Sequence, residues 1–223
     1  LHLHAVTARR TRHRAQEDAG AIQHGVTVVN VGRAHRPLEG IDAIAHRDRT
    51  NAVGLDAPDF DTLVDSPIYC GNPTLKALKV RNVPHLFLVE GRGNYDLDKW
   101  AADTQKIAET AADLWGSIPF DRYVFFNFVG PSFGGGLEHS GSAVMGYDTF
   151  GFAPRDKYVQ QLGLISHEYF HAWNIKRLRP KGLGPFVYQE ENYTHCLWIA
   201  EGHTAYYDNL LVRRSGLCSD DEY

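Results

Sequence analysis

The sequence predicts an α+β fold, with strands followed by two long helices. Three observations predict it: an apolar stripe at helical spacing over residues 97–115, a stretch over residues 123–129 that is apolar except for Asn127, and two further helical patterns over residues 157–174 and 197–211. The chain has 223 residues, is 43% hydrophobic and 22% charged, and carries a net charge of -4, which fits an ordinary globular fold.

The first elements of this fold follow residue 59. Residues 77–80 and 85–90, on either side of Pro84, have the composition of strands. The next helix should begin after Asp96, whose side chain can cap it, and end at Gly116, which accepts a left-handed backbone. Residues 123–129 are apolar on both faces, which favours a buried strand.

The helix predicted over residues 157–174 carries the pentapeptide His167-Glu168-Tyr169-Phe170-His171. Side chains four positions apart lie on one helical face, so His167 and His171 can direct one nitrogen each at a single metal ion. Glu168 then lies beside the ion, where its carboxylate can accept a proton from an attacking water. This H-E-x-x-H pattern is typical of zinc peptidases and predicts one Zn²⁺ ion as the cofactor.

A catalytic zinc site needs a third protein ligand, because two imidazoles do not complete it. The residues after the pentapeptide offer Glu190, Glu191 and Glu201. The first two lie in a polar stretch that is typical of a loop. Glu201 opens an apolar helical pattern, where packing would fix its direction better.

Two stretches, HEYFHAWNIKRLRP and WIAEGHTAYY, together resemble the PDZ-containing glycyl aminopeptidase family, a gluzincin branch related to the larger zinc aminopeptidases. The resemblance selects Glu201, because Trp198 and Gly202 frame it as in a W-x-x-E-G motif, although the spacing found in many relatives would select Glu190. It implies a thermolysin-like zincin catalytic domain, built on a mixed sheet with an edge strand. This domain would remove N-terminal glycine or alanine from peptides.

The stretch FGGGLEH, residues 133–139, resembles the G-G-L-E-H of the same family, which forms an edge strand in relatives. Such a strand can pair with an extended peptide, and a carboxylate at its end can bind a free α-amino group. The resemblance therefore implies that Glu138 binds the substrate's amino terminus, beside ligands His167, His171 and Glu201 and the catalytic base Glu168.

We divide the chain into three parts. Residues 1–58 are rich in arginine and scattered histidines and are expected to be an atypical, poorly ordered segment. Residues 59–95 are expected to be a remnant of the family's β-rich N-terminal domain or linker, and residues 96–223 part of the catalytic domain. We expect the chain to be truncated at its C-terminus, with a PDZ domain and an oxyanion-stabilising tyrosine beyond Tyr223.

Several classes of function are disfavoured. The net charge of -4 does not suit a nucleic-acid binder, and no apolar run is long enough to span a bilayer. No apolar region follows the arginines near the start, so a secretory signal is not indicated, and we expect a soluble protein, with the cytoplasm favoured over export. Open alternatives are a zinc endopeptidase, a zinc-binding but inactive scaffold, and a chance motif without metal.

Some residues near the motif receive a structural interpretation. Asn174 should pack below the metal, and the pair Tyr206 and Tyr207 should belong to a packed aromatic stripe. Lys176, Arg177 and Arg179 should form a solvated charge cluster at the helix C-terminus, where cations complement the helix dipole.

Overall fold

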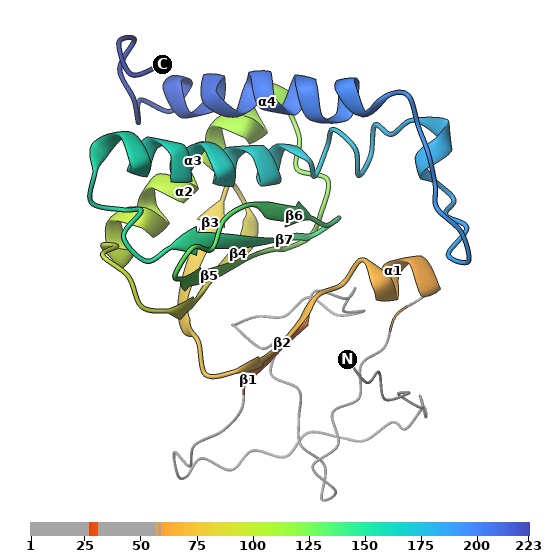
Figure 1. Cartoon of the computed structure of the whole chain (residues 1–223), viewed down its shortest axis with the longest axis horizontal. Coiled ribbons are helices and arrows are strands. Elements are labelled where there is room, and N and C mark those ends of the chain that lie inside the picture. Colours follow the sequence, from red (N-terminus) through yellow and green to blue (C-terminus); the bar gives the residue numbers. More distant parts are fainter. Residues whose placement is uncertain (1–26, 31–56, 58) are drawn as a thin grey trace, which may run out of the picture. The chain divides into compact units, whose positions relative to one another are not determined.

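The computed structural model describes residues 27–30, 57 and 59–223 (Figure 1). The chain divides between Asn72 and Pro73 into two compact units. In the described part of the first unit, β1 (Thr27–Asn30) pairs antiparallel with β2 (Ile68–Gly71), and Asp59 caps the short helix α1 (Phe60–Val64). Apart from β1 and Ala57, the segment 1–58 lies outside the described residues, so our expectation for it remains a prediction.

The second unit is built on a five-stranded mixed sheet, as predicted. Its strand order is β3-β4-β5-β7-β6, with β3/β4 and β6/β7 antiparallel and β4/β5 and β5/β7 parallel. The short strand β6 lies at the edge, which is where the sequence placed it. The strands are β3 (Thr74–Val80), β4 (Val83–Gly91), β5 (Tyr123–Gly130), β6 (Gly136–Glu138) and β7 (Ser142–Asp148).

The sheet differs from the sequence prediction in two places. Strand β7 was not predicted, because its small and polar residues give little alternation, although it lies between β5 and β6. The strands β3 and β4, which lie in the part that we expected to be a remnant of an N-terminal domain or linker, hydrogen-bond into the same sheet as β5. The compact unit accordingly begins at Pro73.

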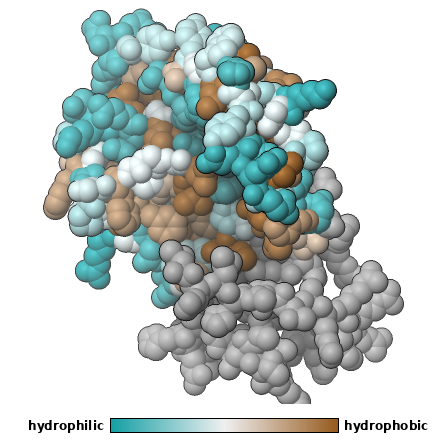
Figure 2. Space-filling view, turned by 45° about the vertical axis from the view of Figure 1, so that its right-hand side comes forward, coloured by the Kyte–Doolittle hydropathy of each residue, from teal (hydrophilic) through white to brown (hydrophobic). Residues whose placement is uncertain are grey.

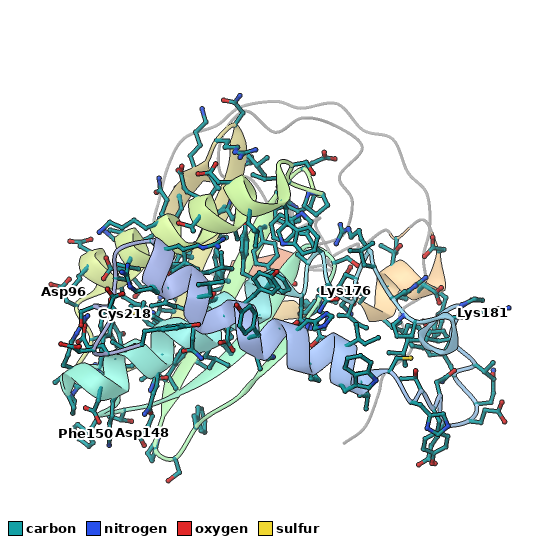
Figure 3. All side chains as sticks on the ribbon, turned by 90° about the horizontal axis from the view of Figure 1, so that it is seen from above. Asp96, Asp148, Phe150, Lys176, Lys181 and Cys218 are labelled. Atoms are coloured by element: carbon teal, nitrogen blue, oxygen red, sulfur yellow. The ribbon has the colours of Figure 1, made fainter. Side chains whose placement is uncertain are left out.

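Helix α2 (Leu97–Trp115) has the ends that the sequence predicted. The Asp96 side chain accepts a hydrogen bond from the Lys99 amide at 3.0 Å, and Gly116 closes the helix with φ of 73°. The buried stripe includes Trp100, which packs edge-on against Phe87 of β4 with ring centroids 4.9 Å apart. Asp96 is labelled at this end of the molecule in Figure 3.

Helices α2 and α3 (Arg155–Phe170) cover one face of the sheet. Helix α4 (Leu197–Arg214) lies against α3 on the side away from the sheet (Figure 1). Helix α3 ends at Phe170, four residues before the end predicted from the sequence, and His171 is its C-terminal cap. The amide of His171 still donates to the carbonyl of His167 at 3.2 Å, so the two histidines keep helical spacing. In the described residues, no helix is long and apolar enough to cross a membrane.

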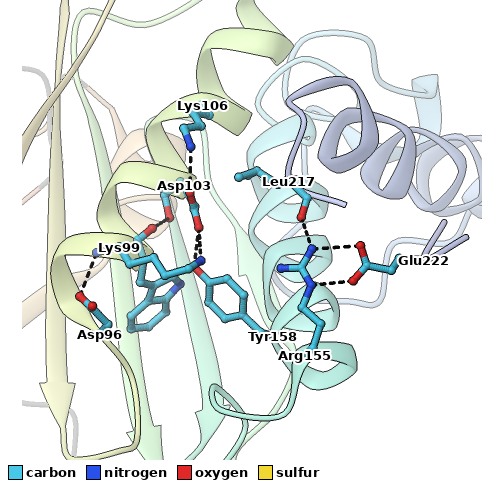
Figure 4. Close-up of polar contacts among 10 residues, drawn as sticks. Asp96, Lys99, Asp103, Lys106, Arg155, Tyr158, Leu217 and Glu222 are labelled. Carbon is cyan, nitrogen blue, oxygen red and sulfur yellow. Dashed lines mark hydrogen bonds and ion pairs between the residues drawn. The ribbon is translucent and has the colours of Figure 1, made fainter. Parts of the chain in front are cut away.

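A buried carboxylate joins α2 to α3 (Figure 4). Asp103 accepts hydrogen bonds from Lys99 at 2.5 Å, Lys106 at 3.2 Å and the Tyr158 hydroxyl at 2.9 Å. Burial alone would raise the pKa of Asp103, but the hydrogen bonds from Lys99, Tyr158 and Lys106 outweigh it and lower the pKa below its ordinary value. This contact fixes the start of α3 against α2.

Hydrophobic side chains remain exposed on the described part of the molecule, and Figure 2 shows brown areas between hydrophilic ones on one face. The segment 178–196 between α3 and α4, together with the first two residues of α4, holds many of them. The exposed large side chains there are Leu178, Phe186, Val187, Tyr188, Tyr193, Leu197 and Trp198.

Candidate metal centre

The two histidines of the pentapeptide lie at the C-terminal end of α3, with ring centroids 4.7 Å apart. The Nδ1 atom of His167 lies 3.0 Å from Oδ2 of Asp208, and the Nδ1 atom of His171 lies 3.0 Å from the carbonyl oxygen of Asn174. A carboxylate and a carbonyl only accept hydrogen bonds, so both Nδ1 atoms carry the hydrogen. In the neutral rings, each Nε2 atom then presents a lone pair.

Both lone pairs point toward Glu201 in the first turns of α4. Its Oε2 atom lies 3.2 Å from Nε2 of His167 and 3.4 Å from Nε2 of His171. Ligand atoms on a tetrahedral zinc with bonds of about 2.0–2.1 Å lie about 3.3 Å apart. The three residues form a group that can hold a metal ion.

The chemistry of this donor set calls for a cation. Three electron-rich atoms converge, and the Nδ1 hydrogens of His167 and His171 are already used by Asp208 and Asn174. Burial alone would lower the pKa of His167, but Asp208, Glu168 and Glu201 outweigh it and raise the pKa. The carboxylates thus favour positive charge at this position, which a metal ion supplies.

Glu168 is buried beside this group, with 4% of its surface exposed. Burial raises the pKa of Glu168 to about 7; the charge of His167 opposes the shift, and the charges of Glu138 and Glu201 add to it. Its Oε2 atom has no hydrogen-bond partner among the described residues. A Cβ atom at Gly136 would overlap the Glu168 carboxyl group, so the glycine of β6 allows this carboxylate to lie under the edge strand.

Glu138 comes to the site from the end of β6. One carboxylate oxygen each from Glu138 and Glu168 and one ring nitrogen of His171 lie within 4.8 Å of one another. The edge strand therefore brings a second carboxylate to the same place. Positive charge, such as an ammonium group, suits the space between these two carboxylates.

The other candidates from the sequence lie elsewhere. Glu190 and Glu191 are exposed between α3 and α4, and neither belongs to the metal-binding groups found among the described residues. Tyr207 stacks on Phe170 with ring centroids 5.1 Å apart, while Tyr206 is exposed. The five residues chosen from the sequence are thus brought together, and Glu190 is not.

Three residues that support the site were not predicted from the sequence to do so. Asp208 and Thr204 were not singled out, and Asn174 was interpreted as packing only. Asp208 is buried and accepts from His167; Thr204 Oγ1 lies 3.4 Å from Nδ1 of His171. The signal was present: Thr204 and Asp208 follow Glu201 by three and seven residues, which places all three on one face of α4.

Two comparisons point to aminopeptidases. The sequence model of the M61 glycyl aminopeptidase family matches residues 160–223, which contain both histidines and Glu201. The fold is similar to a crystal structure of an aminopeptidase N family protein from Idiomarina loihiensis, with a TM-score of 0.73 and 30% sequence identity. That match covers 87% of this chain and 32% of the other chain, so the chain spans about a third of its length. No curated protein matches the sequence.

Proposed function

We propose that this chain carries the site of a zinc-dependent aminopeptidase that releases small N-terminal residues, glycine or alanine, from peptides. The observation that carries the proposal is the convergence of two imidazole lone pairs and one carboxylate on a single point, at distances of 3.2 and 3.4 Å. The similarity to an M61 glycyl aminopeptidase family and to an aminopeptidase N family structure supports the peptidase class.

In this proposal, His167, His171 and Glu201 hold the zinc ion. When bound, zinc lowers the pKa of a coordinated water and polarises the scissile carbonyl. Glu168 accepts the proton of the attacking water and transfers it to the leaving amine. The buried position of Glu168 beside the ligand group places its carboxyl group where it can take up and release this proton.

In the proposal, Glu138 restricts cleavage to the first residue of the peptide. Its carboxylate, at the end of the edge strand, would bind the free α-amino group while the main chain of β6 pairs with the peptide. The preference for glycine or alanine rests on the family resemblance, as does the expectation that the full-length protein carries a PDZ domain. Because Glu138 would bind the free α-amino group, peptides with a blocked amino terminus should be poor substrates.

The metal is tested first. The chain should bind one zinc ion, measured by elemental analysis after dialysis, and Glu201→Ala should lose it. Glu190→Ala is the matched control, because it removes an equal charge from a residue outside the group. A chain without zinc, or one that loses zinc on Glu190→Ala, would refute the ligand assignment.

Catalysis is tested separately with glycyl and alanyl peptides. Glu168→Gln should keep zinc and lose turnover, because the amide cannot accept the proton. Full activity in Glu168→Gln would exclude the role of base. Cleavage of blocked peptides at an equal rate would instead indicate an endopeptidase, and zinc binding without any turnover would indicate an inactive scaffold.

A further inference from the structure

The turn after α3, residues 171–178, is held by main-chain hydrogen bonds of its own. The amide of Asn174 donates to the Phe170 carbonyl at 3.2 Å, and that of Lys176 to the His171 carbonyl at 3.1 Å. Between them Ile175 has φ of 115°, a region that β-branched residues rarely occupy. A strained backbone persists only where its surroundings hold it in place, and such positions gather at functional sites. Lys176 in this turn is labelled in Figure 3.

Asn174 is the main point of attachment between this turn and α4. Its side-chain amide donates to the carbonyl oxygens of Ile199 at 3.2 Å and Ala200 at 3.0 Å, and to Oγ1 of Thr204 at 3.0 Å. The two amide hydrogens are thus shared among three acceptors, all on α4. With 7% of its surface exposed, Asn174 makes these contacts away from water.

The same residue also holds the second histidine. The carbonyl of Asn174 accepts the Nδ1 hydrogen of His171 at 3.0 Å, and Thr204 Oγ1 lies 3.4 Å from that nitrogen. Ala200 and Thr204 flank Glu201 on α4, so Asn174 connects His171 to both sides of the third ligand. One side chain therefore bridges the turn that orients His171 and the helix that carries Glu201.

We propose that Asn174 is a positioning residue that couples α3 to α4 and so fixes the geometry in which His171 and Glu201 meet a metal ion. It touches neither substrate nor metal. The zinc part of this inference rests on the proposed function, whereas the coupling of the two helices does not.

Arg177 provides a matched control in the same turn. Its guanidinium donates to the carbonyls of Ser140 at 2.7 Å, Ala172 at 3.0 Å and Pro119 at 2.7 Å, and none of these three acceptors lies on α4. These contacts correct the interpretation of Arg177 as a merely solvated charge. Removing either side chain should loosen the turn, but only Asn174 should affect α4.

The test measures the zinc dissociation constant by competition with a chelator in the whole chain. Asn174→Ala and Asn174→Asp should weaken zinc binding about 10- to 100-fold, the range usual for residues that orient ligands. The aspartate is informative because it keeps the shape but cannot donate to the α4 carbonyls. The zinc dissociation constant of Arg177→Ala should stay within about twofold of that of the parent chain, because Arg177 does not orient a ligand. An equal loss of zinc affinity in the Asn174 and Arg177 variants, or no loss in the Asn174 variants, would overturn the proposal.

Amide hydrogen exchange on metal-free protein keeps the two proposals distinguishable. Asn174→Ala should speed exchange over residues 200–205 of α4, and Arg177→Ala should not. If the parent chain binds no zinc, the proposed function fails, and this measurement still decides the coupling.

Thr204 provides a second pair of variants if neither Asn174 variant folds. Thr204→Val should weaken zinc binding while Thr204→Ser preserves it, because serine retains the hydroxyl. Equal zinc affinities in that pair would overturn the coupling.

Discussion

Asp208 offers the sharpest test of how the metal centre is built. Its Oδ2 atom accepts the Nδ1 hydrogen of His167 at 3.0 Å, and the residue is 9% exposed. Asp208→Ala removes this acceptor, so the His167 ring loses the partner that fixes its tautomer and its direction. Asp208→Asn keeps an acceptor oxygen but removes the charge. We expect both changes to weaken zinc binding, the alanine more than the asparagine.

The magnitude follows from the one bond lost. A hydrogen bond to a charged group is worth about 1.5–3 kcal/mol when it is shielded from water, as Asp208 is. At about 1.4 kcal/mol per tenfold change in a dissociation constant, Asp208→Ala should raise the zinc dissociation constant about 10- to 150-fold. The asparagine, which retains a neutral hydrogen bond, should lie near or below the lower end of that range.

The assay is a chelator competition titration, with circular dichroism to establish that each variant is folded. Asp220→Asn is the control, because it removes the same charge from an exposed residue that pairs with Arg213 away from the site. A zinc affinity of Asp208→Ala within about twofold of the parent would show that His167 needs no such partner, contrary to the effect expected of a ligand-orienting carboxylate.

Two further predictions concern the base and the core. Gly136→Ala should lower kcat by about 100-fold while zinc is retained, because its Cβ overlaps the Glu168 carboxyl group; Gly134→Ala, with open space around its Cβ, should be nearly neutral, and equal kcat values would contradict the argument. Burial lowers the pKa of His85 from 6.5 to about 4, so the neutral ring stabilises the fold above pH 6.5 and this contribution is lost as the pH falls toward 4. The free energy of unfolding from urea titrations should therefore fall by about 3 kcal/mol over that interval. That decrease should be absent in His85→Leu and present in the exposed control His195→Gln; an unchanged pH profile in His85→Leu would exclude His85 as its source.

Local signals in the sequence were sufficient for several elements. Asp96 and Gly116 defined the ends of α2 because caps depend on a few neighbouring atoms. The histidine spacing identified the functional face of α3 because helical periodicity alone brings positions 167 and 171 together. The mixed sheet and its edge strand at β6 were also predicted and are confirmed.

Features that depend on contacts distant in sequence were missed. Strand β7 has weak alternation and is defined by β5 and β6 on its two sides. The early end of α3 reflects the turn that Asn174 attaches to α4, which no pattern within residues 157–174 reveals. Asp208 acquires its role only because α4 lies beside α3, so the helical spacing from Glu201 became meaningful once the two helices were placed together.

The two histidines are held by partners of different kinds. His171 is oriented by a main-chain carbonyl, which every amino acid at position 174 would provide, whereas His167 is oriented by the side chain of Asp208. A point substitution at position 208 can therefore remove the acceptor of the His167 ring, whereas beside His171 only the Thr204 hydroxyl, 3.4 Å from Nδ1, is open to such a change. Attempts to redesign the proposed zinc site should start at position 208, where the hydrogen-bond acceptor of His167 is itself a side chain.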